Sequence, residues 1–248
     1  MYEYRKTLYQ EYYQTQAGRR SEEGLGKQMP VKLAEDASLL HQEITPLLPP
    51  VAEQPNIIDI GCGFGSWVYA LQQYGYNRVK GIDVSPNQVA VAHELGITAV
   101  EQADLLPYLQ QHPDTFDVIT GIDIVEHFGK DELVTILSAV KQALRKDGIA
   151  VFRTPNADSL FSSLYMYGDF THETILNQSS AQQLLYSIGF SKVMVYASCM
   201  NTSSAVKNAI RRVWWQLVLG VSKAVIFASG RSSRGLILSP NIIISARK

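Results

Sequence analysis

A run of apolar residues that ends in three alternating glycines constrains this chain more than any other feature. Residues 56–65 read Asn-Ile-Ile-Asp-Ile-Gly-Cys-Gly-Phe-Gly, and residues 66–71 then follow a helical pattern. Apolar β-branched residues before such glycines are typical of a buried strand that enters a tight turn. Glycine lets the backbone adopt angles that a side chain forbids and approach a ligand closely. Because the first N–H groups of the following helix have no intrahelical partner, the turn is suited to holding a ligand.

This turn resembles the first signature of the class I S-adenosylmethionine (SAM) dependent methyltransferases, Asp/Glu-x-Gly-x-Gly-x-Gly. In that family the acid holds the amino group of the cofactor, and the glycine turn lies beneath its methionine and ribose. The resemblance therefore implies a SAM site that includes Asp59, Gly61, Cys62, Gly63 and Gly65. A dinucleotide-binding turn would read Gly-x-Gly-x-x-Gly, and Ser66 stands where that pattern has its third glycine. A hydride-transferring enzyme is therefore the weaker alternative.

Two further acids follow the next predicted strands. Asp83 lies 24 residues after Asp59, where a carboxylate can accept both ribose hydroxyls of an adenosine, in SAM and NAD enzymes alike. Asp104 matches the family position that pairs with the adenine amino group, although it also suits the N-cap of the next short helix. The resemblance places the adjoining Val84 and Leu105 in the cofactor site as well.

Strand and helix patterns alternate after residue 56, which is typical of a parallel sheet with crossover helices. We predict strands near 57–60, 79–83, 97–101, 116–120 and 149–153, and closing strands at 192–197 and 242–245. We predict helices near 65–75, 86–95, 105–111, 130–145 and 178–189. This order resembles the Rossmann-like α/β fold of methyltransferases, a seven-stranded sheet with helices on both faces and an antiparallel pair at its end. Residues 1–55 are expected to form a helical N-terminal segment, and residues 56–248 the methyltransferase domain.

About forty residues, 199–239, separate the last two predicted strands, where the family usually has a short turn. At helical spacing, these residues form a wide apolar face: Ile210, Val213, Trp214, Leu217, Val218, Val221 and Val225. A basic amphipathic helix with paired tryptophans is typical of an interfacial anchor, which makes 204–228 a candidate for contact with the inner membrane surface. The alternatives are a lid over the substrate pocket and a helix that forms a homodimer.

Charge is distributed unevenly along the 248 residues, although the net charge is only −1. Glu173 is the last acidic residue and nine basic residues follow it, whereas the first 173 residues hold 13 basic and 23 acidic side chains. Either the C-terminal third meets an anionic surface, such as lipid, nucleic acid or a phosphorylated substrate, or it packs on the acidic part. The sequence contains no recognised nucleic-acid module, so we expect no nucleic-acid partner.

The composition indicates a cytoplasmic protein. With 46% hydrophobic residues the chain can bury one large core, and its two cysteines make no disulfide framework, which suits a reducing cytosol. The polar N-terminus does not resemble a signal peptide, and no run reaches the roughly 20 apolar residues of a membrane span. Peripheral attachment at the inner membrane face is compatible with these features.

A second cluster of polar residues follows the fourth predicted strand, where ligands bind in open α/β sheets. It contains Asp123, which we add to the predicted cofactor site, and the pair Glu126-His127, which recurs in a large branch of the methyltransferases. His172 lies on the loop after the fifth strand. The branch implies that His127 is the general base or orients the nucleophile, that Glu126 or Asp123 stabilises its charged ring, and that His172 faces the acceptor.

Two other interpretations of this cluster remain. With His172 it resembles the metal-binding pattern of the small-RNA 2′-O-methyltransferases, in which these residues would hold a divalent ion. Alternatively, Glu126 and His127 only brace the loop, and His172 is a solvated loop residue. The prediction includes no metal. The remaining histidines, His41, His93 and His112, have no partner pattern and are expected to be structural.

Taken as a resemblance, these motifs imply a SAM-dependent methyltransferase that transfers a methyl group in line to a nucleophile, most readily a hydroxyl. The implied acceptor is a small molecule, a glycan or a lipid-linked compound, as in bacterial enzymes that act on surface glycans or lipid intermediates. The alternative function is a non-catalytic fold that binds SAM and serves as a scaffold or regulatory subunit.

Overall fold

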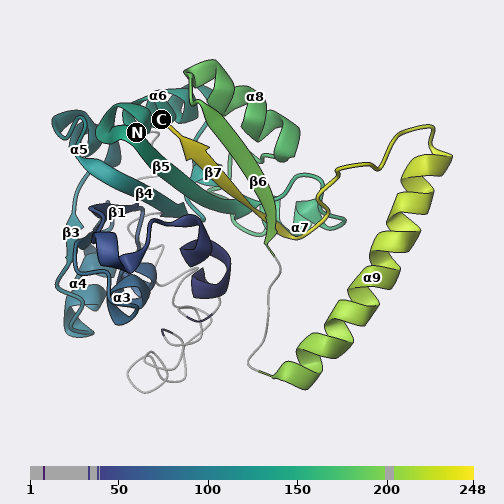
Figure 1. Cartoon of the computed structure of the whole chain (residues 1–248), viewed down its shortest axis with the longest axis horizontal. Helices are drawn as coiled ribbons and strands as arrows, with labels where there is room; N and C mark the ends of the chain where they lie inside the picture. The colour runs from purple at the N-terminus through teal and green to yellow at the C-terminus, as the bar shows by residue number, and fades with distance from the viewer. Residues whose placement is uncertain (1–7, 9–32, 34–37, 39, 199–203) are drawn as a thin grey trace.

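The computed structural model describes residues 8, 33, 38, 40–198 and 204–248 (Figure 1). Its centre is a seven-stranded sheet with the strand order β3-β2-β1-β4-β5-β7-β6. The strands are β1 (Ile57–Ile60), β2 (Val79–Asp83), β3 (Val100–Gln102), β4 (Phe116–Ile122), β5 (Leu144–Pro155), β6 (Lys192–Ser198) and β7 (Asn241–Arg247). Strands β1 to β5 pair in parallel, whereas β7 is antiparallel to both β5 and β6. The predicted sheet and its antiparallel end are therefore confirmed.

Helices connect the strands and lie on both faces of the sheet (Figure 1). They are α3 (Ser66–Gln73), α4 (Pro86–Glu94), α5 (Leu105–Gln111), α6 (Lys130–Ala143), α7 (Ser162–Met166), α8 (Gln178–Ile188) and α9 (Ala205–Ala228). Short 3₁₀ helices are η3 (Thr45–Leu47), η4 (Val51–Glu53) and η5 (Val125–His127). Helix α8 has standard caps at both ends. Asn177 and Ser180 form a capping box at its N-terminus, and Gly189 ends the helix with a φ of 94°.

Two apolar cores lie on opposite faces of the sheet because successive side chains of a strand point to opposite sides. In β1, Ile57 belongs to one core, whereas Ile58 and Ile60 belong to the other. The core of Ile58 and Ile60 packs against α5, α6 and α8. The core of Ile57 packs against α3 and α4, and it includes Ile44 and Leu48 from the segment before β1. Together the cores hold β1 in the middle of the molecule, with its carboxyl end at one edge.

The predicted boundaries differ most from the structure in three places. The strand expected at 97–101 begins only at Val100, because residues 98 and 99 form a turn. The helix expected to reach residue 145 ends at Ala143, and β5 begins at once and extends to Pro155. Of the helical segment expected at 1–55, residues 40–44 are helical and are followed by η3 and η4. Most of the rest of that prediction falls outside the described residues.

Helix α9 occupies the predicted insert between β6 and β7, and Figure 1 shows it lying apart from the sheet and the helices that cover the sheet. Its first turn is capped by Ser204, whose hydroxyl accepts a hydrogen bond from the Lys207 amide. Among the described residues, no helix combines the length and the apolar character that crossing a membrane requires.

Candidate active site

The site is built where the strand order reverses between β1 and β4, the place at which open α/β sheets bind ligands. The glycine turn leaves β1 with positive φ angles at Gly61 (64°), Gly63 (57°) and Gly65 (81°), which side chains rarely adopt. A Cβ atom added to Gly61 would lie 2.6 Å from Cδ1 of Ile124. The turn therefore requires glycine both for its conformation and for its close contact with the loop after β4.

Asp59 lies in β1 beneath this turn and is buried. It pairs in register with Thr120 of β4, and the Thr120 hydroxyl donates a hydrogen bond of 2.7 Å to Oδ1 of Asp59. Burial raises the pKa of Asp59 from 3.8 to about 7, although the bond from Thr120 opposes the rise and the charge of Asp83 adds to it. A cation beside this carboxyl would stabilise its ionised form, so the position is suited to a positively charged group of a ligand.

Asp83 connects the end of β2 to the glycine turn. Its Oδ2 accepts a hydrogen bond of 2.8 Å from the Gly63 amide, and its Oδ1 accepts one of 2.8 Å from the Ser85 amide. Burial raises the pKa of Asp83, and these backbone donors limit the rise. Val84 follows it with an exposed side chain. The carboxylate thus fixes the position of the turn at the edge where a cofactor is predicted.

Cys62 lines the turn and is buried, with its Sγ packed over Gly81 of β2. A Cβ atom on Gly81 would lie 2.6 Å from that sulfur atom. Burial, followed by the charges of Asp59 and Asp83, raises the pKa of the thiol well above its usual value. The thiolate form is therefore disfavoured, which agrees with the expectation that Cys62 lines the turn instead of reacting.

Asp104 stands at the N-cap position of α5, but its side chain makes no capping hydrogen bond there. The side chain is exposed and Leu105 beside it is half-buried. Capping is therefore not what Asp104 does in this structure. Asp59, Asp83 and Asp104 come from β1, β2 and the end of β3, which are neighbours in the sheet, so the three predicted acids lie along one edge.

Asp123 follows β4 and has a φ of 52°, an uncommon value for a residue with a side chain. Its amide donates a hydrogen bond of 2.8 Å to the carbonyl of Arg153 in β5, and its carboxylate pairs with the Arg153 guanidinium. The loop that carries Glu126 and His127 is thereby attached to the carboxyl end of β5. Sequence reasoning missed Arg153, since nothing in the pattern of a buried strand marks one of its residues as an ion-pair partner.

Glu126 and His127 lie in η5, and both are buried. Oε2 of Glu126 accepts a hydrogen bond of 3.0 Å from the Thr154 hydroxyl at the end of β5. Burial, and next the charge of Asp123, raise the pKa of Glu126 well above its usual value, against the smaller effects of hydrogen bonds and Arg153. Nδ1 of His127 lies 2.8 Å from Oγ1 of Thr171 on the loop after β5.

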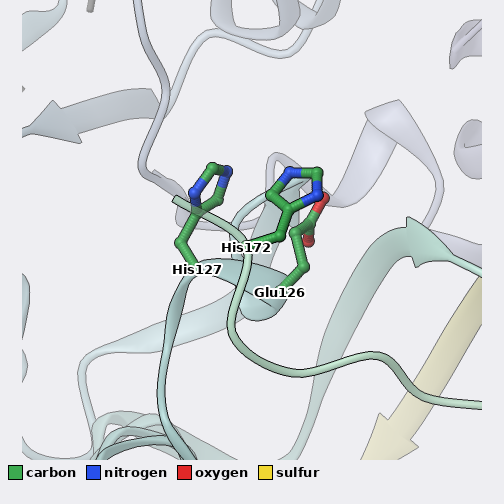
Figure 2. Close-up of side chains that lie close together, drawn as sticks. All are labelled: Glu126, His127 and His172. Carbon is green, nitrogen blue, oxygen red and sulfur yellow. The ribbon is translucent and has the colours of Figure 1, made fainter. Parts of the chain in front are cut away.

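His172, from the same loop, completes the cluster. Figure 2 shows its ring beside that of His127, with the Glu126 carboxylate next to it. The ring centroids of the two histidines are 4.8 Å apart and their planes are inclined by 76°. Nδ1 of His172 donates a hydrogen bond of 2.8 Å to the Tyr165 carbonyl, so Nε2 carries the lone pair of the neutral ring. One ligand atom from each of Glu126, His127 and His172 lies within 4.8 Å of the others, so this group could hold a metal ion.

A cavity of about 510 Å³ opens next to this cluster. It is lined by Met166, Tyr167, Asp169, Phe170 and His172. The side chains of Tyr167 and Phe170 are 82% and 81% exposed, which is unusual for aromatic residues. The cavity therefore combines apolar, aromatic walls with a histidine of the cluster.

The three remaining histidines make local contacts. The ring of His41 stacks on Tyr74, Nε2 of His93 bonds the Val100 carbonyl, and Nδ1 of His112 bonds the Tyr108 carbonyl. These contacts agree with the structural role that the sequence indicated. Thr120 and Thr154 were missed, although a hydroxyl in a buried strand next to an acid is a signal that sequence reasoning could have used.

Comparison with known proteins identifies the family. Residues 27–195, more than half of the chain, match the family described as "Methyltransferase domain". A sphingolipid C9-methyltransferase of Candida albicans is 31% identical over 106 residues, which cover 38% of this chain and 20% of that enzyme. A ubiquinone biosynthesis O-methyltransferase of Sodalis glossinidius is 29% identical over 109 residues, 41% of each chain. The matched region thus spans less than half of either relative.

A solved SAM-dependent methyltransferase of Archaeoglobus fulgidus has the same fold, with a TM-score of 0.64 at 21% identity over 89% of this chain and 98% of that one. The fold and the family match together define a class I SAM-dependent methyltransferase. The chain belongs to the methyltransferase-domain family, and it shares the fold of the SAM-dependent enzymes. The hydride-transferring alternative is therefore wrong.

Proposed function

We propose that this methyltransferase methylates a hydroxyl group of a small-molecule, glycan or lipid-linked acceptor, with histidine-assisted removal of the proton. The observation that carries the proposal is the cluster of Glu126, His127 and His172 at the carboxyl ends of β4 and β5, in contact with an aromatic cavity through His172. A hydroxyl must lose its proton when it is methylated, and a neutral imidazole is suited to accept one.

The residues at the carboxyl ends of β1 to β3 fit SAM. Asp59 is a buried carboxyl with a raised pKa, so the amino group of the donor would stabilise its charged form. Gly61, Gly63 and Gly65 give the turn its positive φ angles, and Asp83 lies at the end of β2, where a carboxylate can accept the ribose hydroxyls. In this proposal the site comprises Asp59, Gly61, Cys62, Gly63, Gly65, Asp83, Val84, Asp104, Leu105 and Asp123.

When bound, SAM supplies a methyl group carried on a positively charged sulfur. The chain has to align the acceptor oxygen with this methyl group, and alignment is the largest catalytic contribution in such a transfer. As the oxygen–carbon bond forms, His127 takes the hydroxyl proton on Nε2. The buried Glu126 lies beside the ring that becomes charged; burial disfavours its carboxylate form, and the imidazolium would restore that form and be stabilised by it in turn.

The proposal is tested with methyl-labelled SAM and three acceptor classes: an alkyl catechol, an alkyl glycoside and a sugar linked to a polyprenyl phosphate. We expect at least one class to be methylated, and His127→Gln to lower kcat roughly 100-fold, the usual contribution of a general base. The dissociation constant for S-adenosylhomocysteine should stay within twofold. His112→Gln, which removes a histidine that contacts Tyr108 and Phe116 and lies outside the cluster, is the matched control.

Three results would contradict the proposal. Full activity of both His127→Gln and His172→Gln would remove the role of the cluster. Binding of S-adenosylhomocysteine without methylation of any of the acceptors would favour the scaffold alternative. Loss of activity in EDTA that is restored only by a divalent ion would show that the cluster of Figure 2 holds a metal instead of acting as a base.

We further propose that α9 places the enzyme on an anionic membrane surface. Seven apolar side chains of the helix are 54–70% exposed and lie at helical spacing: Val206, Ile210, Val213, Trp214, Leu217, Val221 and Val225. The opposite side, which includes Ser222, is less exposed. The helix also carries four exposed basic residues, Lys207, Arg211, Arg212 and Lys223, and no acid. An apolar stripe with basic residues is the arrangement that binds anionic lipid.

Flotation with vesicles of phosphatidylcholine alone, or mixed with phosphatidylglycerol, tests this second proposal. We expect binding only to the anionic vesicles. Each basic residue near such a surface contributes about 1 kcal/mol, so Arg211→Gln with Arg212→Gln should weaken partition roughly 30-fold. Trp214→Ser with Leu217→Ser should also weaken it, whereas Gln216→Ala, on an exposed polar position, should not. Unchanged partition after removal of residues 201–238, or a dimer formed through α9 without lipid, would contradict membrane attachment.

A further inference from the structure

His127, one member of the cluster in Figure 2, begins a continuous row of three hydrogen-bonded side chains. Nδ1 of His127 lies 2.8 Å from Oγ1 of Thr171, and Oγ1 of Thr171 lies 2.6 Å from Oδ1 of Asp169. Thr171 is only 2% exposed. The Thr171 amide also donates to Oδ1 of Asp169, at 2.9 Å, so two donors of Thr171 hold this carboxylate oxygen. The sequence motifs did not mark Thr171 or Asp169.

The row has a defined direction. A carboxylate oxygen only accepts hydrogen bonds, so the single proton of the Thr171 hydroxyl is donated to Asp169. The hydroxyl oxygen must then accept from His127, which means that Nδ1 of His127 carries a hydrogen. A neutral imidazole has one N–H, so its lone pair lies on Nε2. Thr171 and Asp169 thus select one of the two neutral forms of the ring.

We propose that Thr171 and Asp169 are positioning residues that hold His127 in the form able to take the acceptor proton on Nε2. This inference rests on the proposed role of His127 as the base. When Nε2 takes the proton, the Nδ1–H bond to Thr171 remains in place, and the ring becomes positively charged at the end of a row that terminates in a carboxylate. Thr171 and Asp169 neither gain nor lose a proton in this step.

The position of Asp169 gives the row a link to the acceptor. Asp169 lines the 510 Å³ cavity together with His172, so the loop that shapes the cavity also orients the base. The same hydrogen bonds would also stabilise the loop if it had no catalytic role. The two explanations differ in one respect, because only the positioning role requires a hydroxyl at residue 171 in order to fix the His127 ring.

The test compares Thr171→Val, which keeps the shape and removes the hydroxyl, with Thr171→Ser, which keeps the hydroxyl. The ¹⁵N NMR spectrum of labelled histidine shows which ring nitrogen is protonated, and the His127→Gln variant assigns the signals. We expect the neutral ring of His127 to carry its proton on Nδ1 in the wild type and in Thr171→Ser, and to shift towards protonation on Nε2 in Thr171→Val. Far-UV circular dichroism and S-adenosylhomocysteine binding verify that each variant is folded.

The kinetic measurement uses the acceptor found among the three classes named above. Thr171→Val should lower kcat roughly 10- to 100-fold with little change in KM, the range typical of residues that orient a reactive histidine, and Thr171→Ser should restore it. Thr174→Val is the matched control, because Thr174 lies on the same loop and its hydroxyl donates a hydrogen bond of 2.7 Å to a backbone carbonyl, that of Phe128, instead of contacting an imidazole.

If the histidine NMR spectrum of Thr171→Val equals that of the wild type, the inference is overturned, whatever the activity of the variant. An equal loss of kcat in Thr174→Val would also overturn it, because the loop alone would then explain the effect. The proposed function fails separately: full activity of His127→Gln would remove the base even if the NMR spectra show that Thr171 fixes the ring. If methyl transfer depends on His127 but not on Thr171, the proposed function is supported and the positioning role of Thr171 and Asp169 is overturned.

Discussion

Replacing Asp59 by Asn should stabilise the ligand-free protein at alkaline pH while it weakens binding of the cofactor. Asp59 is buried in the centre of the sheet, with one hydrogen bond from Thr120 to its carboxyl group. Burial raises its pKa from 3.8 to about 7 in the folded protein. The unfolded chain has no such burial, so there the group ionises near its ordinary value. The folded protein therefore retains a proton on Asp59 in a pH range where the unfolded chain has lost it.

The sign and the size of the effect follow from this difference. Between pH 4 and pH 7 the folded state binds more protons than the unfolded state, so the free energy of unfolding falls as the pH rises and stays low above pH 7. The fall over the whole range is about 4 kcal/mol, and about 3 kcal/mol of it occurs between pH 5 and pH 8. An asparagine does not ionise. The Asp59→Asn variant should therefore gain about 3 kcal/mol relative to the wild type between these two pH values.

Urea unfolding of the ligand-free proteins at pH 5 and pH 8 measures this gain, which corresponds to a shift of about 1 M in the midpoint. Asp147→Asn is the matched control, because Asp147 is exposed and its φ of 64° suits asparagine equally well. Calorimetry should show that Asp59→Asn weakens S-adenosylhomocysteine binding roughly 10- to 150-fold, as expected for one hydrogen bond to a charged group. An equal difference between Asp59→Asn and the wild type at both pH values would refute the reasoning.

Three further substitutions test the turn, the core and the base of the insert. Gly61→Ala should lower the free energy of unfolding by about 1–3 kcal/mol and weaken S-adenosylhomocysteine binding, because the added Cβ would lie 2.6 Å from Ile124 at a φ of 64°. Unchanged urea unfolding and unchanged binding in calorimetry would contradict this. Leu137→Ala should lower the free energy of unfolding by about 2–5 kcal/mol and leave binding unchanged, since Leu137 is buried in α6 away from the turn. Asn156→Ala should speed amide hydrogen exchange in residues 237–239, because its Nδ2 donates to the carbonyls of Ile237 (2.7 Å) and Ser239 (2.9 Å); equal exchange rates would show that these bonds do not hold the insert.

The fold was predictable wherever local pattern and tertiary packing agree. The bounds of β1, β2 and α5 coincide with the predicted ranges, because apolar runs between turn residues leave one choice of element. Ile97 shows where this fails. The side chain of Ile97 is buried near Gly65, which explains why this residue is apolar. Ile97 nevertheless lies outside β3, because the two residues that follow it form a turn. At Asp147 the chain takes a φ of 64° inside β5, an irregularity that the sequence does not mark.

The candidate site was predictable where a residue type and a strand end coincide. Asp59, Asp83 and the pair Glu126-His127 each stand in or directly after a strand that binds ligands in this fold. Thr171 and Asp169 could not be found in this way, because Thr171 contacts His127 across 44 positions through the path of a loop, and Asp169 contacts only Thr171 in this row. A hydroxyl on a loop gives no periodic or spacing signal. The residues that orient a reactive group are therefore less accessible to sequence reasoning than the reactive group itself.

The uneven distribution of charge has two explanations that apply to different parts of the chain. At the C-terminus, Nζ of Lys248 pairs with Asp114 at 2.7 Å and bonds the Leu144 carbonyl at 2.6 Å, so this basic residue packs on the acidic domain. The basic residues of α9, such as Arg211 and Arg212, are exposed on a helix that lies apart from the sheet. The basic residues of α9 therefore differ from Lys248 in lying on an element apart from the acidic domain. Because exposed charges are screened by salt, binding of anionic vesicles should weaken steeply between 0.05 and 0.5 M salt if α9 is the contact, while the stability of the domain should change little.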